Sequence, residues 1–256
     1  MKYTFIPRVL ALGAICASIS LAQPMGRPLN IPAVISEPGS YTLMVDSFNT
    51  GTGAAIRVMA SGVTIDLNGR QLQGPGNVQG VGIDIAGANG VTIRNGNIAN
   101  FAIAVRISGS TNVTVRDLNI RAMNLVPSSG PPETAVMIAQ SSAVTVRDNN
   151  ISNTGLGIFV RGGDSRGNFI IGNSIVGGSN GVLGICYNPT ETDSRSPRYD
   201  SIEGNLISGF RTGIQFAASS GPSLTRRNTI FYRGNTAIEI NETGSLDQEN
   251  VKVRIQ

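Results

Sequence analysis

The sequence predicts an all-β fold, a right-handed parallel β-helix of about eight coils that follows an N-terminal signal peptide. Three observations support this prediction. A short motif recurs every 22 to 32 residues, β-branched and polar residues alternate within each copy, and the chain holds 32 Gly but no Trp and only 5% aromatic residues. Such a composition suits short strands separated by tight turns. The handedness follows from the general preference for right-handed crossovers.

The most regular repeat starts at Val63, Val91, Val113 and Val144 and reads VTIDLN, VTIRNG, VTVRDL and VTVRDN. Weaker copies continue the series, and its central column is Ile65, Ile93, Val115, Val146, Ile170, Ile202 and Thr225. Parallel stacking of these units, about 4.8 Å apart, would bury the column. The shortest spacings define one coil, so the longer ones predict inserted loops.

Two further columns accompany the first. The upstream strands read AAIRVM from Ala54, VGIDIA from Val81, IAVRIS from Ile103, TAVMIA from Thr134, LGIFVR from Leu156, NGVLGI from Asn180, TGIQFA from Thr212 and TAIEIN from Thr236. Downstream, an asparagine stands two residues before an isoleucine at Asn149, Asn173, Asn205 and Asn228. We expect these asparagines to tolerate left-handed backbone and to hydrogen-bond their neighbours in adjacent coils.

The N-terminus has the features of a signal peptide over residues 1–22, with cleavage after Ala22. We expect a secreted or periplasmic protein with no transmembrane segment after cleavage; a retained N-terminal anchor is the alternative. Residues 23–48 are predicted to form a linker and an N-terminal cap, and residues 49–256 the β-helix. Segments 124–133 and 187–199 are predicted to loop out. Cys186 is the only cysteine after cleavage, which excludes an intramolecular disulfide.

Three segments carry a resemblance to a known group of proteins. They are the lead-in ISEPGSYTLMV from Ile35, VTIDLNG from Val63 and GVTIRNG from Gly90. Together they resemble the exported right-handed β-helix repeat proteins of the pectate-lyase-like superfamily, over roughly residues 31–251. The resemblance implies the fold and leaves the subgroup open, because the superfamily includes lyases, hydrolases, epimerases, phage tail proteins and adhesins.

The chain contains no histidine, which excludes imidazole catalysis and any zinc or copper site with histidine ligands. Loss of Lys2 and Arg8 with the signal peptide lowers the formal charge from +4 to +2 and leaves Lys252 as the only lysine. A charge of +2 does not indicate nucleic-acid binding. The remaining candidates for binding or catalysis are arginine and carboxylate side chains.

The outward positions of the VTIR strand form the column Asp66, Arg94, Arg116, Arg147, Ile171, Glu203 and Arg226. The three successive arginines predict a cationic ladder that could pair with uronate or sulfate groups. Some lyases of the resembling superfamily use arginine as the base while calcium acidifies the substrate proton, which implies Arg116 or Arg147 as base here. The alternative is a solvated ladder whose charge Asp66 and Glu203 balance.

The upstream strand presents a second outward column: Arg57, Asp84, Arg106, Met137, Phe159, Leu183, Gln215 and Glu239. Its first three members predict a salt-bridge ladder across coils, with Arg106 as a substrate-binding candidate beside Arg94. Phe159 is a candidate sugar-stacking platform; otherwise it is apolar surface beneath a loop.

Asp117 and Asp148 occupy the same position in adjacent coils, next to the arginine ladder. The pair could hold calcium or act as acid and base. Alternatively, both are turn residues that accept backbone N–H bonds. No calcium-loop motif is present, so calcium is a candidate cofactor and no metal site is identified.

These observations lead to two functional hypotheses. In the first, an exported β-helix protein binds an acidic polysaccharide along one face of the solenoid, and in its stronger form cleaves that polymer by β-elimination. In the second, the protein is a non-catalytic structural, adhesion or scaffold protein. The sequence leaves open whether the chain is an enzyme, which substrate it takes and what oligomer it forms.

Overall fold

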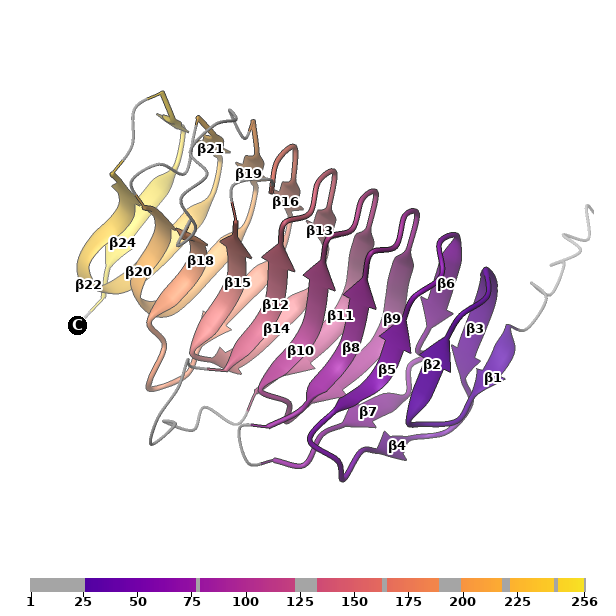
Figure 1. The fold of residues 1–256 in the computed structure, drawn as a ribbon. Helices are drawn as coiled ribbons and strands as arrows, with labels where there is room; N and C mark the ends of the chain where they lie inside the picture. Colours follow the sequence, from indigo (N-terminus) through magenta and orange to yellow (C-terminus); the bar gives the residue numbers. More distant parts are fainter. Residues whose placement is uncertain are drawn as a thin grey trace, which may run out of the picture.

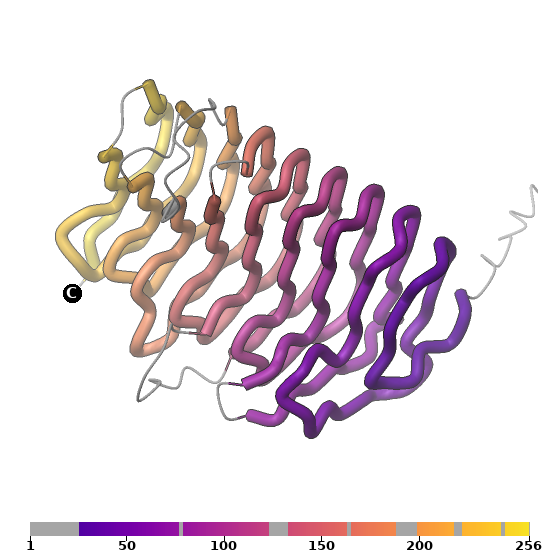
Figure 2. The backbone as a smooth tube through the Cα atoms, in the orientation of Figure 1, coloured from indigo at the N-terminus to yellow at the C-terminus, as the bar shows by residue number. Residues whose placement is uncertain are grey.

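The computed structural model describes residues 26–76, 79–122, 133–162, 165–188, 199–217, 222–241 and 244–255. These residues form parallel strands wound into one solenoid of about eight coils, with no helix among them (Figures 1 and 2). No part of this described chain is a helix long and apolar enough to cross a membrane. The predicted signal peptide, residues 1–22, lies outside the described residues, as do residues 124–132 and 189–198 of the two predicted loops.

Each coil contributes a strand to each of three sheets, which we name I, II and III. Sheet I stacks β2 (Ala33–Ile35), β5 (Ala54–Val58), β8 (Val81–Ala86), β10 (Ile103–Ser108), β12 (Thr134–Ala139), β15 (Leu156–Arg161), β18 (Leu183–Asn188) and the second halves of β20 (Leu206–Phe216) and β22 (Thr229–Ile240).

Sheet II follows the VTIR motif. It stacks β1 (Arg27–Leu29), β3 (Gly39–Leu43), β6 (Val63–Asp66), the first halves of β9 (Thr92–Ala99) and β11 (Thr114–Arg121), then β13 (Thr145–Arg147), β16 (Phe169–Ile171), β19 (Ser201–Glu203), β21 (Leu224–Arg226) and β23 (Leu246–Gln248).

Sheet III completes each coil. It stacks β4 (Ser47–Phe48), β7 (Gln71–Gln73), the second halves of β9 and β11, β14 (Asn150–Thr154), β17 (Ser174–Gly177), the first halves of β20 and β22, and β24 (Val251–Arg254).

The core is a set of aliphatic columns that run the length of the solenoid. The inward residues of sheets II and III have no exposed surface at positions such as Ile65, Ile93, Ile151 and Ile207. Each buried side chain of this size stabilises the fold by about 1.5–3 kcal/mol. This repeated burial explains why units of 22 to 32 residues fold as a stack.

Sheets II and III meet at a one-residue corner with left-handed backbone. The corner residues Asn95, Asp117, Asp148, Gly172, Gly204, Arg227 and Glu249 have φ between +52° and +64°. The expectation that the next residue, the stacked asparagine, would take this conformation was wrong. The residue before the asparagine has the left-handed backbone instead, and the asparagine side chain points inward.

The inward side chains form an asparagine ladder, which we define as Asn149, Asn173, Asn205, Asn228 and Asn250. The Nδ2 of each of the first four donates to Oδ1 of the next, over 2.8–3.0 Å. Each of these Oδ1 atoms also accepts the backbone N–H of the preceding rung, over 2.8–3.1 Å. The first four rungs are at most 2% exposed. The predicted hydrogen bonding between coils is therefore confirmed.

Three local expectations change in the structure. Cys186, not Leu183, pairs with Phe159, so the predicted alignment of NGVLGI was wrong by three residues. Tyr187, expected at the start of a loop, lies in β18 with no exposed surface and its ring 5.0 Å from that of Phe216. Residues 27–29, expected in a linker, form β1 and pair with β3.

Candidate functional site

The predicted arginine ladder exists on sheet II. Arg94, Arg116 and Arg147 are register partners in successive coils. Each guanidinium already has a carboxylate: Arg94 Nε lies 3.0 Å from Asp66 Oδ2, Arg116 pairs with Asp117, and Arg147 Nη1 lies 2.5 Å from Asp148 Oδ2. The ladder is therefore charge-compensated along its length.

Glu203, expected to balance this ladder, lies further along the column and pairs with other arginines. Its carboxylate lies 2.8 Å from Arg226 Nη2 and 3.6 Å from Arg227 Nη1. The carboxylates that balance the three ladder arginines are instead Asp66 and the two corner aspartates.

Asp117 and Asp148 lie at the left-handed corner between sheets II and III, which makes them turn residues. Each carboxylate accepts from the arginine that precedes it in the chain. Among the described residues, no group of three His, Cys, Asp or Glu side chains is placed to hold a metal ion. The calcium that the sequence suggested as a candidate thus finds two carboxylates at most, and both are already ion-paired.

Sheet I contains the predicted salt-bridge ladder across coils. Asp84, whose side chain is 4% exposed, accepts two hydrogen bonds from Arg106, at 2.8 and 2.9 Å, and lies 3.9 Å from Arg57. The hydrogen bonding that Arg106 donates to Asp84 raises the pKa of the Arg106 guanidinium. Arg106 is thereby engaged in holding a buried carboxylate.

Phe159, the candidate stacking platform, lies between Met137 and Cys186 in the register of sheet I. It is partly buried rather than exposed. Cys186 is buried as well, and this burial raises the pKa of its thiol to about 12. The C-terminal part of this column therefore presents little accessible ring surface.

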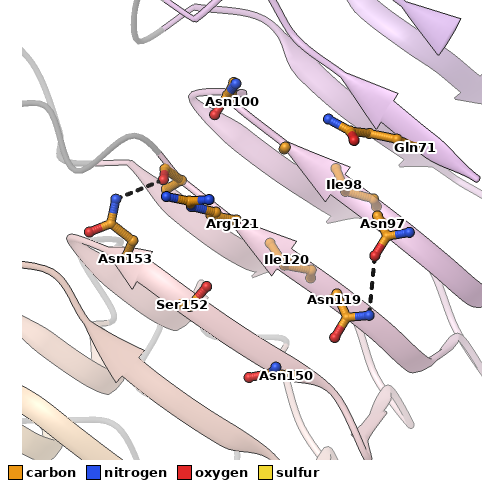
Figure 3. Close-up of a pocket in the computed structure, with 12 residues that line it drawn as sticks. Gln71, Asn97, Ile98, Asn100, Asn119, Ile120, Arg121, Asn150, Ser152 and Asn153 are labelled. Atoms are coloured by element: carbon orange, nitrogen blue, oxygen red, sulfur yellow. Dashed lines mark hydrogen bonds between the residues drawn. The ribbon is translucent and has the colours of Figure 1, made fainter. Parts of the chain in front are cut away.

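A groove that the sequence did not indicate lies on sheet III (Figure 3). Its volume is about 530 Å³. It crosses the strands β7, β9, β11 and β14. We call it the amide groove, and its lining residues are Gln71, Asn97, Ile98, Ala99, Asn100, Asn119, Ile120, Arg121, Ala122, Asn150, Ser152 and Asn153.

The floor of the amide groove is a stack of side-chain amides. Asn97, Asn119 and Asn150 are register partners in three successive coils, and Asn119 Nδ2 donates to Asn97 Oδ1 over 3.1 Å. Asn97 Nδ2 donates to the carbonyl of Gly69 over 2.9 Å. The Asn150 side chain makes no hydrogen bond with any described residue. The stack therefore offers unoccupied donors and acceptors to a ligand.

Arg121 contributes the only positive charge among the residues that line the amide groove. Its side chain is exposed and forms no ion pair or hydrogen bond with the described part of the chain. In its column, Ala99 and Ser152 are the register partners in the two adjacent coils. Unlike the ladder arginines of sheet II, Arg121 is free to bind an anionic group.

The outward column that contains Arg121 continues toward the N-terminal coil. Gln73 pairs with Ala99, and Phe48 pairs with Gln73. The Phe48 side chain is 55% exposed and lines a second hollow of about 190 Å³, which shares Gln71 with the amide groove. The surface thus combines amides, one free guanidinium and an accessible aromatic ring along one face.

The sequence contains a signal for this surface. An asparagine precedes the buried isoleucine at Asn97, Asn119 and Asn150, and period-two alternation places all three outward on one sheet. The hollow itself also needs the side chains of Asn100 and Asn153, which follow the strand columns and have left-handed backbone. The repeat has no column at either position, so the sequence pattern does not show that these two side chains line a hollow.

The fold and these faces define a right-handed β-helix protein with a polar groove on one side. Residues 57–249 match the model of the family described as periplasmic copper-binding protein (NosD). Because the match covers more than half of the chain, the protein belongs to the NosD family.

Solved structures with the same fold include the Dettilon tailspike protein (gp208), at a TM-score of 0.56 and 16% identity, over 89% of this chain and 54% of the tailspike chain. An alginate lyase from Paenibacillus sp. str. FPU-7 aligns with a TM-score of 0.55 and 13% identity, over 86% of this chain and 92% of the lyase. The chain thus spans about half of the tailspike. No curated protein matches the chain in sequence.

Among the residues that the structure describes, neither an imidazole nor a thiolate is available to copper. Copper sites in proteins use imidazole, thiolate or thioether ligands, and the whole chain lacks histidine. Cys186 is buried with its thiol pKa raised to about 12, so it remains protonated at neutral pH. Within the described residues no group of three His, Cys, Asp or Glu side chains could hold a metal ion.

Proposed function

We propose that this chain is an exported polysaccharide-binding protein and that the amide groove is its binding surface. The observation that carries the proposal is the free Arg121 beside a stack of side-chain amides with unoccupied hydrogen-bond donors and acceptors. Phe48 is exposed further along the same face. Hydroxyl groups of a sugar exchange hydrogen bonds with side-chain amides, and its apolar face stacks on an aromatic ring. The resemblance in fold to a tailspike and an alginate lyase is consistent with this class of ligand.

The acidic character of the ligand follows from Arg121. A guanidinium makes two parallel hydrogen bonds to a carboxylate or sulfate, and such charge-assisted bonds are about twice as strong as neutral ones. No carboxylate side chain lines the groove to compete for it. The proposed ligand is therefore a polysaccharide with anionic groups.

Cleavage by β-elimination would require Arg116 or Arg147 to act as a base on sheet II. A general base needs a nitrogen that is open to the substrate proton, and a guanidinium that donates to a neighbouring carboxylate is not open in this way. Both arginines have such a partner. We therefore favour binding over cleavage.

The test uses the purified protein and a panel of pectate, alginate and glycosaminoglycans, with and without calcium. Binding is measured by calorimetry, and an unsaturated uronate product by its ultraviolet absorbance. The variant Arg121→Gln should weaken binding about tenfold, since one charged hydrogen bond contributes about 1.5–3 kcal/mol. Arg147→Gln is the matched control and should leave binding unchanged.

Each other outcome selects a different function. An unsaturated product that disappears in Arg147→Gln would locate an eliminase on the sheet II ladder. No binding to any polymer would contradict the proposal and leave the structural, adhesion or scaffold alternative.

A further inference from the structure

Sheet III has an unusual balance of charge along the path that a polymer would take. One outward column reads Phe48, Gln73, Ala99, Arg121, Ser152 and Val176 from β4 to β17, and the other reads Gln71, Asn97, Asn119, Asn150 and Ser174 from β7 to β17. Asp46, whose carboxylate accepts the Gln71 backbone N–H over 2.9 Å, lies beyond the N-terminal end of the second column and is negative. Arg121 is the single charged residue in either column, and its neighbours in the adjacent coils are Ala99 and Ser152. Neither outward column therefore contains a second cation in the two coils on either side of Arg121.

We infer that the amide groove is built for a largely neutral polysaccharide with sparse anionic groups, no more than about one for every five sugar units, and not for a polyuronate. This inference rests on the proposed function and concerns the ligand of the same groove. Coils repeat about every 4.8 Å, which is similar to the length of one sugar unit in an extended chain. A polymer that follows the groove thus meets one coil per unit, and one unit in that stretch meets Arg121.

A polyuronate would place carboxylates on units that meet amides or small side chains instead of a guanidinium. Amide N–H groups can hydrogen-bond such a carboxylate but do not neutralise its charge. Moving these carboxylates out of water without a counter-charge costs free energy. For the neutral units, the same amides are matched donors and acceptors for hydroxyl groups.

Three oligosaccharide probes of equal backbone length separate these ligand classes: xylohexaose, xylohexaose with one glucuronate branch, and hexagalacturonate. Affinities are measured by calorimetry with the full chain at about 0.15 M salt, where long-range charge effects are screened. The singly charged probe should bind at least about tenfold more tightly than the other two, as one charge-assisted contact predicts.

Two variants assign the preference to residues. With Arg121→Gln, the singly charged and neutral probes should bind equally, because the only counter-charge is gone. With Asn119→Ala, all three affinities should fall together, because that side chain contacts hydroxyl groups in every case.

The outcomes are distinct. Tightest binding of hexagalacturonate would overturn the inference and leave the proposed polysaccharide-binding function standing. No binding of any probe would overturn both. An unchanged preference in Arg121→Gln would also overturn the inference, because the charge would then be recognised elsewhere.

Discussion

Removal of one rung from the asparagine ladder should be far more costly than removal of an exposed asparagine. In Asn205→Ala the chain loses four side-chain hydrogen bonds. Oδ1 accepts two from Asn173, over 2.9 and 3.0 Å, and Nδ2 donates to the Ile170 carbonyl and to Asn228 Oδ1, each over 2.9 Å. A typical hydrogen bond contributes about 1 kcal/mol net, so we expect a loss of about 4 kcal/mol in the free energy of unfolding.

The assay is guanidinium denaturation followed by circular dichroism, with Asn119→Ala as the matched control. Asn119 is exposed and its side chain makes one hydrogen bond, to Asn97. That control should cost less than about 1 kcal/mol. Equal costs for the two variants would refute the reasoning, because they would show that the ladder bonds merely replace bonds to water.

Three further perturbations test other parts of the fold. Asp84→Ala should lower the free energy of unfolding by about 3 kcal/mol in chemical denaturation, because it leaves Arg106 without its buried partner. The control Arg27→Ala, at an exposed ion pair, should lower it by less than about 1 kcal/mol. Native Cys186 should react with iodoacetamide about a thousandfold more slowly at pH 8 than the unfolded chain, since burial raises its thiol pKa to about 12 and only the thiolate attacks. Fast native alkylation would contradict this burial. Gly157→Ala should lower the melting temperature markedly, because a Cβ there would lie 2.3 Å from the Gly184 carbonyl oxygen.

The stacking on sheet II was predictable residue by residue. Each VTIR copy combines a β-branched column with an outward polar position, and Arg94, Arg116 and Arg147 are register partners as expected. The ion pairs were harder to predict. Arg116 and Arg147 pair with the aspartate that follows each in sequence, because the left-handed corner brings that carboxylate beside the guanidinium.

The misaligned strand near Cys186 has a simple physical origin. Asn180-Gly-Val and Leu183-Gly-Ile both place an aliphatic residue after a glycine, so the signature that opens LGIFVR occurs twice in this segment. Spacing did not decide between them, because an inserted loop follows. Burial decides it in the structure: Ile185 is fully buried, whereas Val182 is only partly buried.

The amide groove shows the other limit of sequence reasoning. Columns of exposed asparagine have the composition of an ordinary solvated face, and their alternation does not show whether the face is flat or hollow. The hollow is lined by Asn100, directly after β9, and by Asn153, at an irregularity near the end of β14; both have left-handed backbone. Arg121 is likewise distinguished from the ladder arginines only by its lack of a carboxylate partner among the described residues, which the structure shows.

The asparagine ladder also has a direction. In each of the first four rungs an N–H of Nδ2 donates to the amide oxygen in the next coil, so these amide dipoles align head to tail along the solenoid axis, as peptide dipoles do in a helix. The positive end of this array is the Nδ2 of Asn250, which donates to the Asp247 carboxylate over 2.7 Å. The C-terminal coil thus carries the electrostatic counterpart of a helix N-cap, and a neutral residue at position 247 would leave the positive pole of the rod uncompensated.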